Sequence, residues 1–167
     1  MDSIQEYYFS RKLKEVAQLN AEGMDIISLA IGSPDMPPSQ QTIDKLSEVA
    51  RRPDAHGYQP SSGLPELRQA MADFYDRTYG VSLDWKTEVQ PIIGSKEGIM
   101  YATLAFCNAG DEVLIPDPGY PTYTAINRIF GTKITYYTLR EDNGWQPDFD
   151  ELEGRDLSKV KIMWTNY

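Results

Sequence analysis

The sequence predicts an α/β domain with a parallel sheet at its centre, and three observations lead to this expectation. From Glu88 onward, short apolar runs alternate with stretches whose apolar residues recur at helical spacing. A glycine-flanked turn at residues 94–98 lies between an apolar run and an expected helix. A further run, 133–139, is rich in the β-branched and aromatic residues that favour strands. Strands joined by helical crossovers run parallel, so their carboxyl ends meet at one edge of the sheet.

The N-terminal half is expected to consist of helices separated by turns. Apolar residues at helical spacing predict helices over residues 3–21, 40–51 and 64–79. Gly23 ends the first of these, Ser39 caps the second and Gly80 stops the third. Between the first two helices, a short extended run at 26–31 leads into a proline-rich turn at 32–38, whose composition sustains neither helix nor strand.

The C-terminal half is expected to alternate strand and helix. Strands are predicted over 89–93, 111–115, 133–139 and 160–165, and helices over 96–108, 121–130 and 148–153. Gly94, residues 116–119 and Asn166 then follow strands at the sheet edge where ligands of such folds bind. A wound sheet normally continues into a covering helix, so we expect the sequence to be truncated at Tyr167 and to belong to a longer domain.

Composition argues against several classes of partner and site. The chain of 167 residues has 16 Lys plus Arg against 25 Asp plus Glu, and its net charge of −9 disfavours nucleic acid or an anionic membrane. No window has the apolar length of a membrane span and the N-terminus lacks a signal peptide, so a cytoplasmic location is expected. Cys107 is expected in the core, and His56 has no partners in the sequence that would indicate a metal site.

Residues 94–98 form a candidate seat for a phosphate group. Backbone N–H groups at a helix N-terminus, with the partial positive charge there, bind an anion without a particular side chain. The segment has neither P-loop nor dinucleotide-binding spacing, and a plain structural turn is an equal alternative at this point. A lysine in the first turn of a helix more often faces solvent, so Lys96 is not assigned as a Schiff-base lysine.

Tyr120 is a candidate stacking residue for a flat cofactor. Pro118 and Pro121 restrict the backbone on both sides of it, so the ring has little entropy left to lose on binding. From the local sequence alone, a core aromatic residue is an equal alternative.

Four motifs follow one another along the chain. They are Leu-Ala-Ile-Gly-Ser-Pro-Asp at 29–35, Gly-Tyr-Gln-Pro-Ser-Ser-Gly-Leu-Pro-Glu-Leu-Arg at 57–68, Gly-Ser-Lys-Glu-Gly at 94–98 and Asp-Pro-Gly-Tyr-Pro-Thr-Tyr at 117–123. In order and approximate spacing, the chain from about residue 27 resembles the first part of a class I/II aminotransferase, a fold type I enzyme dependent on pyridoxal 5′-phosphate. The last two motifs are most similar to the subgroup of LL-diaminopimelate and related aspartate-type aminotransferases.

The resemblance implies a domain organisation. Residues 53–167 would be part of the three-layer α/β/α large domain that binds the cofactor. Residues 1–52 would form an N-terminal arm that contributes to the small domain. A homodimer is implied as well, because Tyr58 matches a tyrosine that reaches across a dimer interface to the phosphate of the neighbouring subunit.

The resemblance also implies roles for the other matched residues. The backbone amides of Lys96 and Glu97, with help from Ser95, would hold the cofactor phosphate, and Tyr120 would stack on the pyridine ring. Gly32 matches the glycine whose backbone meets the substrate carboxylate. For Gly32 and Tyr58 the alternatives are a turn glycine and an aromatic ring packed on the following helix.

The reacting residues of the family are expected beyond position 167. They are the Schiff-base lysine, the aspartate at the pyridine nitrogen and the arginine that pairs with the substrate carboxylate. The implied parent enzyme transfers an amino group from an amino acid to a 2-oxo acid, and the fragment alone is expected to be inactive. Three alternatives stay open: a carbon–sulfur lyase or other eliminating enzyme of the same fold, a non-catalytic domain that kept the phosphate seat, and a sugar-phosphate or nucleotide-binding α/β protein.

Overall fold

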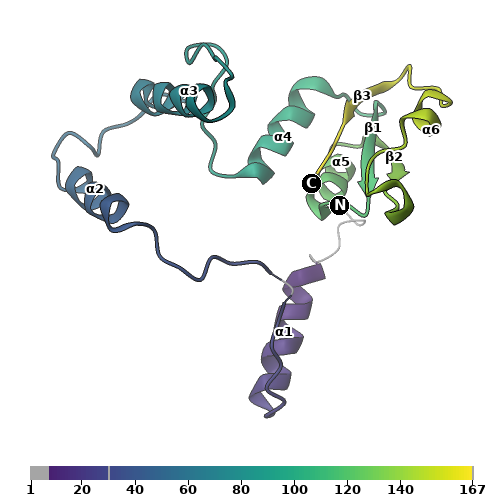
Figure 1. The fold of residues 1–167 in the computed structure, drawn as a ribbon, viewed down its shortest axis with the longest axis horizontal. Coiled ribbons are helices and arrows are strands. Elements are labelled where there is room, and N and C mark those ends of the chain that lie inside the picture. Colours follow the sequence, from purple (N-terminus) through teal and green to yellow (C-terminus); the bar gives the residue numbers. More distant parts are fainter. Residues whose placement is uncertain (1–7, 30, 167) are drawn as a thin grey trace. The chain divides into compact units, whose positions relative to one another are not determined.

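The computed structural model describes residues 8–29 and 31–166. Contacts along the chain divide the described residues into two units, 8–91 and 92–166. The parallel sheet belongs to the second unit (Figure 1). The domain boundary expected between residues 52 and 53 stays a prediction.

The helices of the first unit lie where the sequence predicts them. They are α1 (Tyr8–Ala21), α2 (Gln40–Ala50) and α3 (Pro65–Tyr79). The hydroxyl of Ser39 accepts the backbone N–H of Thr42 at 3.3 Å and caps α2. Pro65 occupies the first turn of α3, and Gly80 ends it with a left-handed φ of 67°. Residues 3–7 of the first expected helix lie outside the described residues.

A parallel sheet in the order β2-β1-β3 organises the second unit (Figure 1). Its strands are β1 (Glu112–Asp117), β2 (Lys133–Thr138) and β3 (Val160–Met163). β1 pairs in parallel with both neighbours, and its residues from Glu112 to Pro116 are buried. The parallel arrangement that the alternation of strands and helices predicts is confirmed for these three strands.

Helices pack on both faces of the sheet, which is therefore the middle layer of three. The helical segments of this unit are α4 (Ser95–Phe106), α5 (Pro121–Ile129), the short 3₁₀ turn η1 (Glu141–Asn143) and α6 (Phe149–Glu153). Val113 and Ile115 pack against α4 and α5 on one face, whereas Leu114 packs against α6 on the other. Successive residues of a strand point to opposite faces, so one buried strand supplies both halves of the core.

The strand expected over residues 89–93 is wrong, since these residues form no ladder. Their backbone groups have other partners. The carbonyl of Val89 accepts from the guanidinium of Arg68 at 2.9 Å, and the N–H of Ile93 donates to the carboxylate of Glu97 at 2.7 Å. Pro91 has no N–H to donate to a neighbouring strand.

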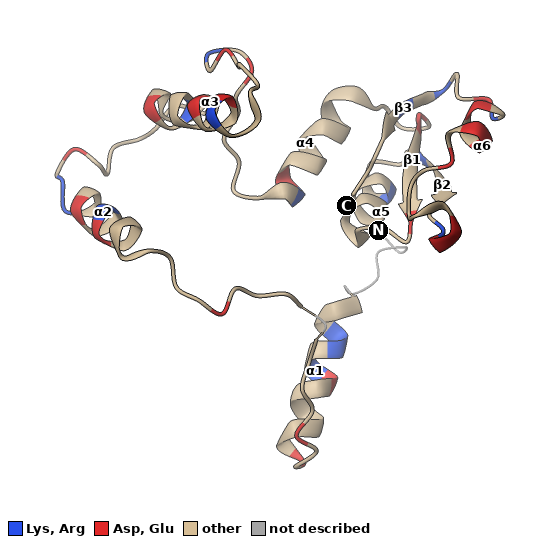
Figure 2. Ribbon diagram, viewed as in Figure 1, with Lys and Arg blue, Asp and Glu red and all other residues tan. Residues whose placement is uncertain are grey.

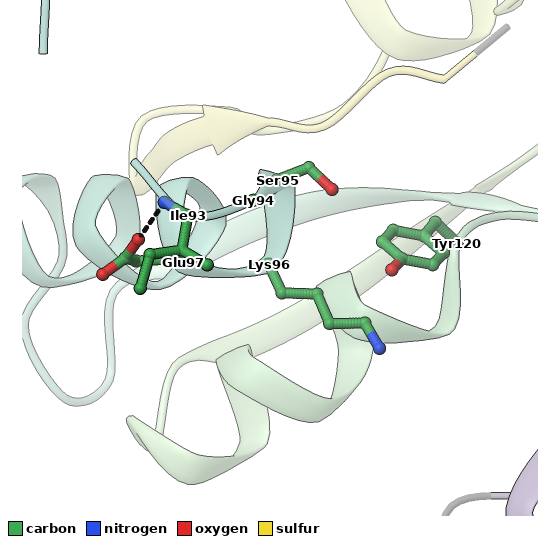
Figure 3. Close-up of a pocket in the computed structure, with 6 residues that line it drawn as sticks. All are labelled: Ile93, Gly94, Ser95, Lys96, Glu97 and Tyr120. Atoms are coloured by element: carbon green, nitrogen blue, oxygen red, sulfur yellow. Dashed lines mark hydrogen bonds between the residues drawn. The ribbon is translucent and has the colours of Figure 1, made fainter. Parts of the chain in front are cut away.

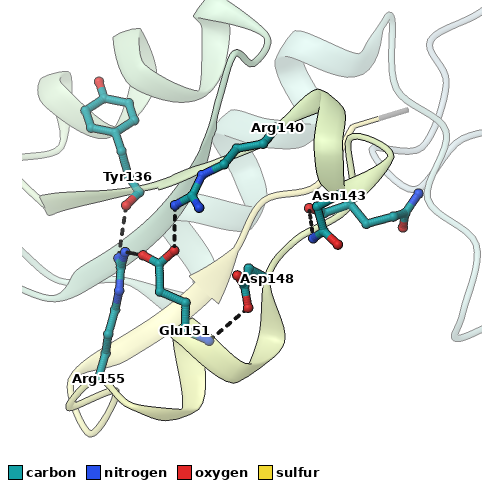
Figure 4. Close-up of polar contacts among 7 residues, drawn as sticks. Tyr136, Arg140, Asn143, Asp148, Glu151 and Arg155 are labelled. Carbon is teal, nitrogen blue, oxygen red and sulfur yellow. Dashed lines mark hydrogen bonds and ion pairs between the residues drawn. The ribbon is translucent and has the colours of Figure 1, made fainter.

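The connection between β2 and β3 is fixed by a cluster around Glu151 (Figure 4). The carboxylate of Glu151 accepts from Arg140 at 3.1 Å and also from Arg155. Arg155 donates in addition to the carbonyl of Tyr136 on β2, at 3.0 Å. The carboxylate of Asp148 accepts the N–H of Glu151 at 3.0 Å and caps α6. These contacts attach α6 to β2 and to the loop that precedes it.

Glu112 joins β1 to β2 at the amino end of the sheet. Its carboxylate accepts from the hydroxyl of Thr135 and, at 3.0 Å, from the ammonium of Lys133. These two hydrogen bonds hold the pKa of Glu112 below its ordinary value. An acidic side chain at a buried strand residue is thereby compensated by groups on the neighbouring strand.

Acidic residues are spread over α2, α3 and α6 (Figure 2), in agreement with the net charge of −9. Among the residues that the structure describes, no helix has the length and apolar character needed to cross a bilayer.

Candidate functional site

The carboxyl ends of β1 and β3 lie side by side where the strand order of the sheet reverses. β1 connects through α5 to β2 on one side, whereas β3 pairs with its other side. In open α/β sheets ligands bind in the crevice at such a position. Tyr120 follows β1 there, and Asn166 follows β3.

An open pocket of about 520 Å³ lies between the N-terminus of α4 and Tyr120 (Figure 3). Its lining consists of Ile93, Gly94, Ser95, Lys96, Glu97 and Tyr120. The pocket thus brings the residues predicted for the phosphate seat together with the predicted stacking ring. Their assigned contacts with a cofactor stay predictions.

The first turn of α4 has the geometry of an anion seat. Gly94 precedes the helix in an extended conformation, and its carbonyl accepts the N–H groups of Glu97 at 3.1 Å and Gly98 at 3.3 Å. A Cβ built on Gly94 would meet no atom within 4 Å, so open space remains beside the turn. First-turn N–H groups and the helix dipole attract an anion into such a space. The amide of Glu97, which the resemblance assigns to the phosphate, is already engaged with Gly94.

The carboxylate of Glu97 serves as a cap of α4. It accepts the N–H of Ile93 at 2.7 Å and the phenol of Tyr101 at 3.0 Å. The hydrogen bond to Glu97 raises the pKa of Tyr101 and favours the protonated phenol that donates it. Figure 3 shows Glu97 turned toward Ile93, whereas Lys96 extends on the side of Tyr120. The Glu97 carboxylate in this motif is therefore engaged by other groups of the protein. Its position as the third residue of the helix is one from which an acidic side chain can cap the N-terminus.

Tyr120 is half-buried and directly precedes α5, which begins at Pro121. Its ring meets that of Tyr123 edge-on, with centroids 5.8 Å apart and planes at 90°. Its backbone N–H donates to the side-chain oxygen of Asn166 at 3.0 Å. Burial raises the pKa of Tyr123, whose phenol donates to the carbonyl of Thr165 at 3.1 Å. Tyr120 thus borders the pocket while Asn166 contacts its backbone and Tyr123 contacts its ring.

Gly119 is required by the close packing of the loop after β1. A Cβ at this position would lie 2.3 Å from the carbonyl oxygen and 2.8 Å from Cγ of Pro116. The preceding peptide bond, between Asp117 and Pro118, is cis. The sequence marks Gly119 as part of a motif, but only the folded loop shows why a side chain is excluded.

A second open pocket, of about 530 Å³, lies along the same sheet edge. It is lined by Pro118, Gly119, Tyr120, Leu139, Trp145 and Asn166. Sequence reasoning missed Trp145, which is half-exposed and has a φ of 59° directly after Gly144 at 60°. The backbone N–H of Trp145 donates to the carbonyl of Arg140 at 2.8 Å. The Asn-Gly pair before it was the available signal of a tight turn.

Gly32 and Tyr58 belong to the first unit. The side chain of Tyr58 is fully exposed, and a Cβ at Gly32 would meet no atom within 4 Å. The role assigned to Tyr58 requires a second subunit and the role assigned to Gly32 requires a substrate, so both stay predictions.

Cys107 and His56 have ordinary structural surroundings. Cys107 packs against the core cluster beneath α4, as expected, and burial raises the pKa of its thiol. A ring nitrogen of His56 lies 3.0 Å from the carbonyl oxygen of Ala50, a backbone partner that the sequence did not reveal.

The pocket beside α4 fits a phosphorylated aromatic ligand. The helix N-terminus offers backbone donors and open space at Gly94 for the phosphate, and the Ser95 hydroxyl and Lys96 ammonium come from the same turn. The Glu97 carboxylate is bound to the backbone of Ile93. A half-buried tyrosine ring borders the same space and is available to an aromatic partner.

Residues 24–167 match the family model of aminotransferase class I and II. The LL-diaminopimelate aminotransferase of Dehalococcoides mccartyi is 41% identical over 167 residues, which are 100% of this chain and 43% of that protein. The enzyme of the same name from Moorella thermoacetica is 44% identical over 161 residues, covering 96% of this chain and 41% of that protein. The chain thus spans less than half the length of these curated relatives.

Solved structures have the same fold. The apo structure of BacF from Bacillus subtilis matches with a TM-score of 0.89 at 36% identity, covering 98% of this chain and 42% of that chain. An aminotransferase from Staphylococcus aureus matches with a TM-score of 0.85 at 30% identity, covering 99% of this chain and 42% of that chain. The likeness confirms the partial fold type I domain expected from the sequence.

Proposed function

Because the chain belongs to the class I and II aminotransferases, we propose that it is the N-terminal portion of an enzyme that transfers an amino group from an amino acid to a 2-oxo acid with pyridoxal 5′-phosphate. The observation that carries this proposal is the pocket in which the N-terminus of α4 faces Tyr120. Bound there, the cofactor supplies an electron sink for the carbon that loses and gains the amino group.

The residues predicted for the site, four of which line the pocket while Gly32 belongs to the first unit, have these parts in the proposal. The first turn of α4, with Ser95 and Lys96, binds the phosphate, and Glu97 fixes the turn through its bond to Ile93. Tyr120 stacks on the pyridine ring, and Gly32 meets the substrate carboxylate. The Schiff-base lysine, the pyridine-binding aspartate and the carboxylate-binding arginine belong to the remainder of the protein, so residues 1–167 alone are expected to be inactive.

We further infer a homodimer in the cytoplasm and a substrate class. Full exposure of Tyr58 supports its contact with a second subunit. The names of the two relatives make LL-diaminopimelate the first amino donor to test. Such a donor carries an amino group and a carboxylate at each end, so a site for it must recognise charge at a distance from the reacting carbon.

Absorbance spectroscopy of the full-length protein tests the proposal. Adding pyridoxal phosphate is expected to give a protein-bound visible band that an amino-acid donor abolishes and a 2-oxo acid restores. Product analysis serves as the control, because transfer yields a 2-oxo acid without free ammonia, whereas elimination releases the amino group. A band that no donor changes, or ammonia formed in the same amount as the 2-oxo acid, would contradict the proposal.

A further inference from the structure

We propose that Asn166 is a positioning residue that holds Tyr120 at the cofactor pocket. The inference rests on the proposed function, because that function gives the Tyr120 ring its stacking role. Asn166 follows β3 and Tyr120 follows β1, 46 residues apart in sequence, and the side-chain oxygen of Asn166 accepts the Tyr120 N–H at 3.0 Å. The contact joins two neighbouring strand ends at the edge where the ligand binds.

The backbone around Tyr120 explains why this hydrogen bond matters. Tyr120 occupies the cap position of α5, and an N–H at that position has no acceptor within the helix. Pro121 directly after Tyr120 and Pro118 two residues before it have no N–H to donate. The bond from Asn166 therefore engages the Tyr120 N–H, while the Tyr120 carbonyl accepts the N–H of Tyr123 at 3.1 Å in the first turn of α5.

Asn166 is itself presented by an anchored segment. The N–H of Trp164 donates to the carbonyl of Leu114 at 2.9 Å, and the Trp164 carbonyl accepts the phenol of Tyr137 at 2.6 Å. The Trp164 ring stacks on Tyr123 with centroids 5.1 Å apart and planes at 16°. The Tyr123 phenol donates to the carbonyl of Thr165 at 3.1 Å. The residues just before Asn166 are thus tied to β1, β2 and α5, so they form a fixed support for its side chain.

A positioning role and a merely stabilising role lead to different results. If Asn166 only stabilised the fold, its loss would lower the unfolding temperature and leave the bound cofactor in the same contact with Tyr120. If Asn166 acts through Tyr120, its effect on cofactor affinity disappears when the ring is absent.

The experiment uses the full-length protein and compares wild type with Asn166→Ala, Asn166→Asp, Tyr120→Ala and the double variant. Hydrogen exchange of the Tyr120 amide without cofactor reports on the bond itself. Asn166→Ala is expected to speed this exchange and to raise the dissociation constant of pyridoxal phosphate about fivefold, the effect of one hydrogen bond. Asn166→Asp keeps an acceptor oxygen and is expected to keep the exchange slow. In the Tyr120→Ala background, Asn166→Ala is expected to change the dissociation constant no further.

Asn108→Ala is the matched control, since Asn108 is exposed in the loop before the amino end of β1. It is expected to leave both measurements as in wild type. Unchanged amide exchange in Asn166→Ala, or an equal loss of affinity with and without the Tyr120 ring, would overturn the inference. A wild-type protein that binds no pyridoxal phosphate would instead contradict the proposed function. The exchange measurement would still report on the contact between Asn166 and Tyr120.

Discussion

Gly119 shows at the scale of one residue how tightly the loop after β1 is built. A Cβ there would lie 2.3 Å from the carbonyl oxygen of Pro116. This oxygen is a backbone atom, so it cannot move aside as the end of a flexible side chain can. Gly119→Ala is therefore expected to lower the free energy of unfolding by about 1–3 kcal/mol, the usual cost of overpacking. Urea unfolding of the full-length protein measures this change.

Gly154→Ala is the control for this prediction. The nearest atom to a Cβ at Gly154 is the carbonyl oxygen of Glu151, at an ordinary contact distance of 3.5 Å. Its effect is expected to stay within about 0.5 kcal/mol. Similar unfolding curves for Gly119→Ala and Gly154→Ala would mean that the loop relaxes and that its packing does not require glycine.

Residues of the site differ in how far the sequence reveals them. The place of Tyr120 at the pocket could be predicted, because the nearby prolines that restrict its backbone are visible in the local sequence. The contact from Asn166 could not, since it depends on β1 pairing with β3, which no local pattern specifies. Trp145 was missed for a related reason, because its left-handed backbone and its place in a pocket arise from the folded connection between β2 and β3.

The N-terminus of α4 is the element whose chemistry can be tested most directly. Ser95→Pro removes one backbone N–H from the seat while a proline in the first helical position preserves the helix. If first-turn amides bind the phosphate, the dissociation constant of pyridoxal phosphate is expected to rise about tenfold or more, the effect of losing a hydrogen bond to a charged group. Titration of the full-length protein, followed by absorbance, measures it.

Two comparisons isolate the amide in this experiment. Ser95→Ala keeps the N–H and loses only the hydroxyl, so it is expected to bind the cofactor more tightly than Ser95→Pro. Pyridoxal, which lacks the phosphate, is expected to bind wild type and Ser95→Pro equally. A parallel loss for pyridoxal and its phosphate would show that the proline acts on the fold and not on the anion seat.

Elements with their own local signals were predicted well. The capping hydroxyl of Ser39 and the left-handed Gly80 delimit helices in the structure as they do in the sequence. The wrong strand at 89–93 shows the limit, because an apolar run becomes a strand only where another strand accepts its hydrogen bonds. In the described chain, the backbone at Val89 and Ile93 is engaged by side chains of Arg68 and Glu97.

At the scale of the whole molecule, the proposed dimer predicts a shared site. A heterodimer of one Tyr58→Phe subunit and one Tyr120→Ala subunit would contain one site with both tyrosines intact and one lacking both roles. We expect it to bind one equivalent of pyridoxal phosphate per dimer with wild-type affinity. Differently tagged subunits purified through both tags and titrated with the cofactor give this stoichiometry.

The two homodimers are the controls for the shared site. Each variant homodimer carries the same defect in both of its sites, so neither is expected to bind with wild-type affinity. If Tyr58 served the pocket of its own subunit, the heterodimer would also have a defect in both sites. The absence of a tight site in the heterodimer would therefore contradict a contact across the interface.

The strand order β2-β1-β3 has a consequence for how the site comes into being during synthesis. A chain leaves the ribosome from its N-terminus, whereas a domain generally folds as a unit. The turn at Gly94 and the ring of Tyr120 are made early, but the acceptor at Asn166 follows 46 residues after the ring it holds. The contact that holds Tyr120 at the pocket is therefore complete only after β3 has been synthesised and has paired with β1.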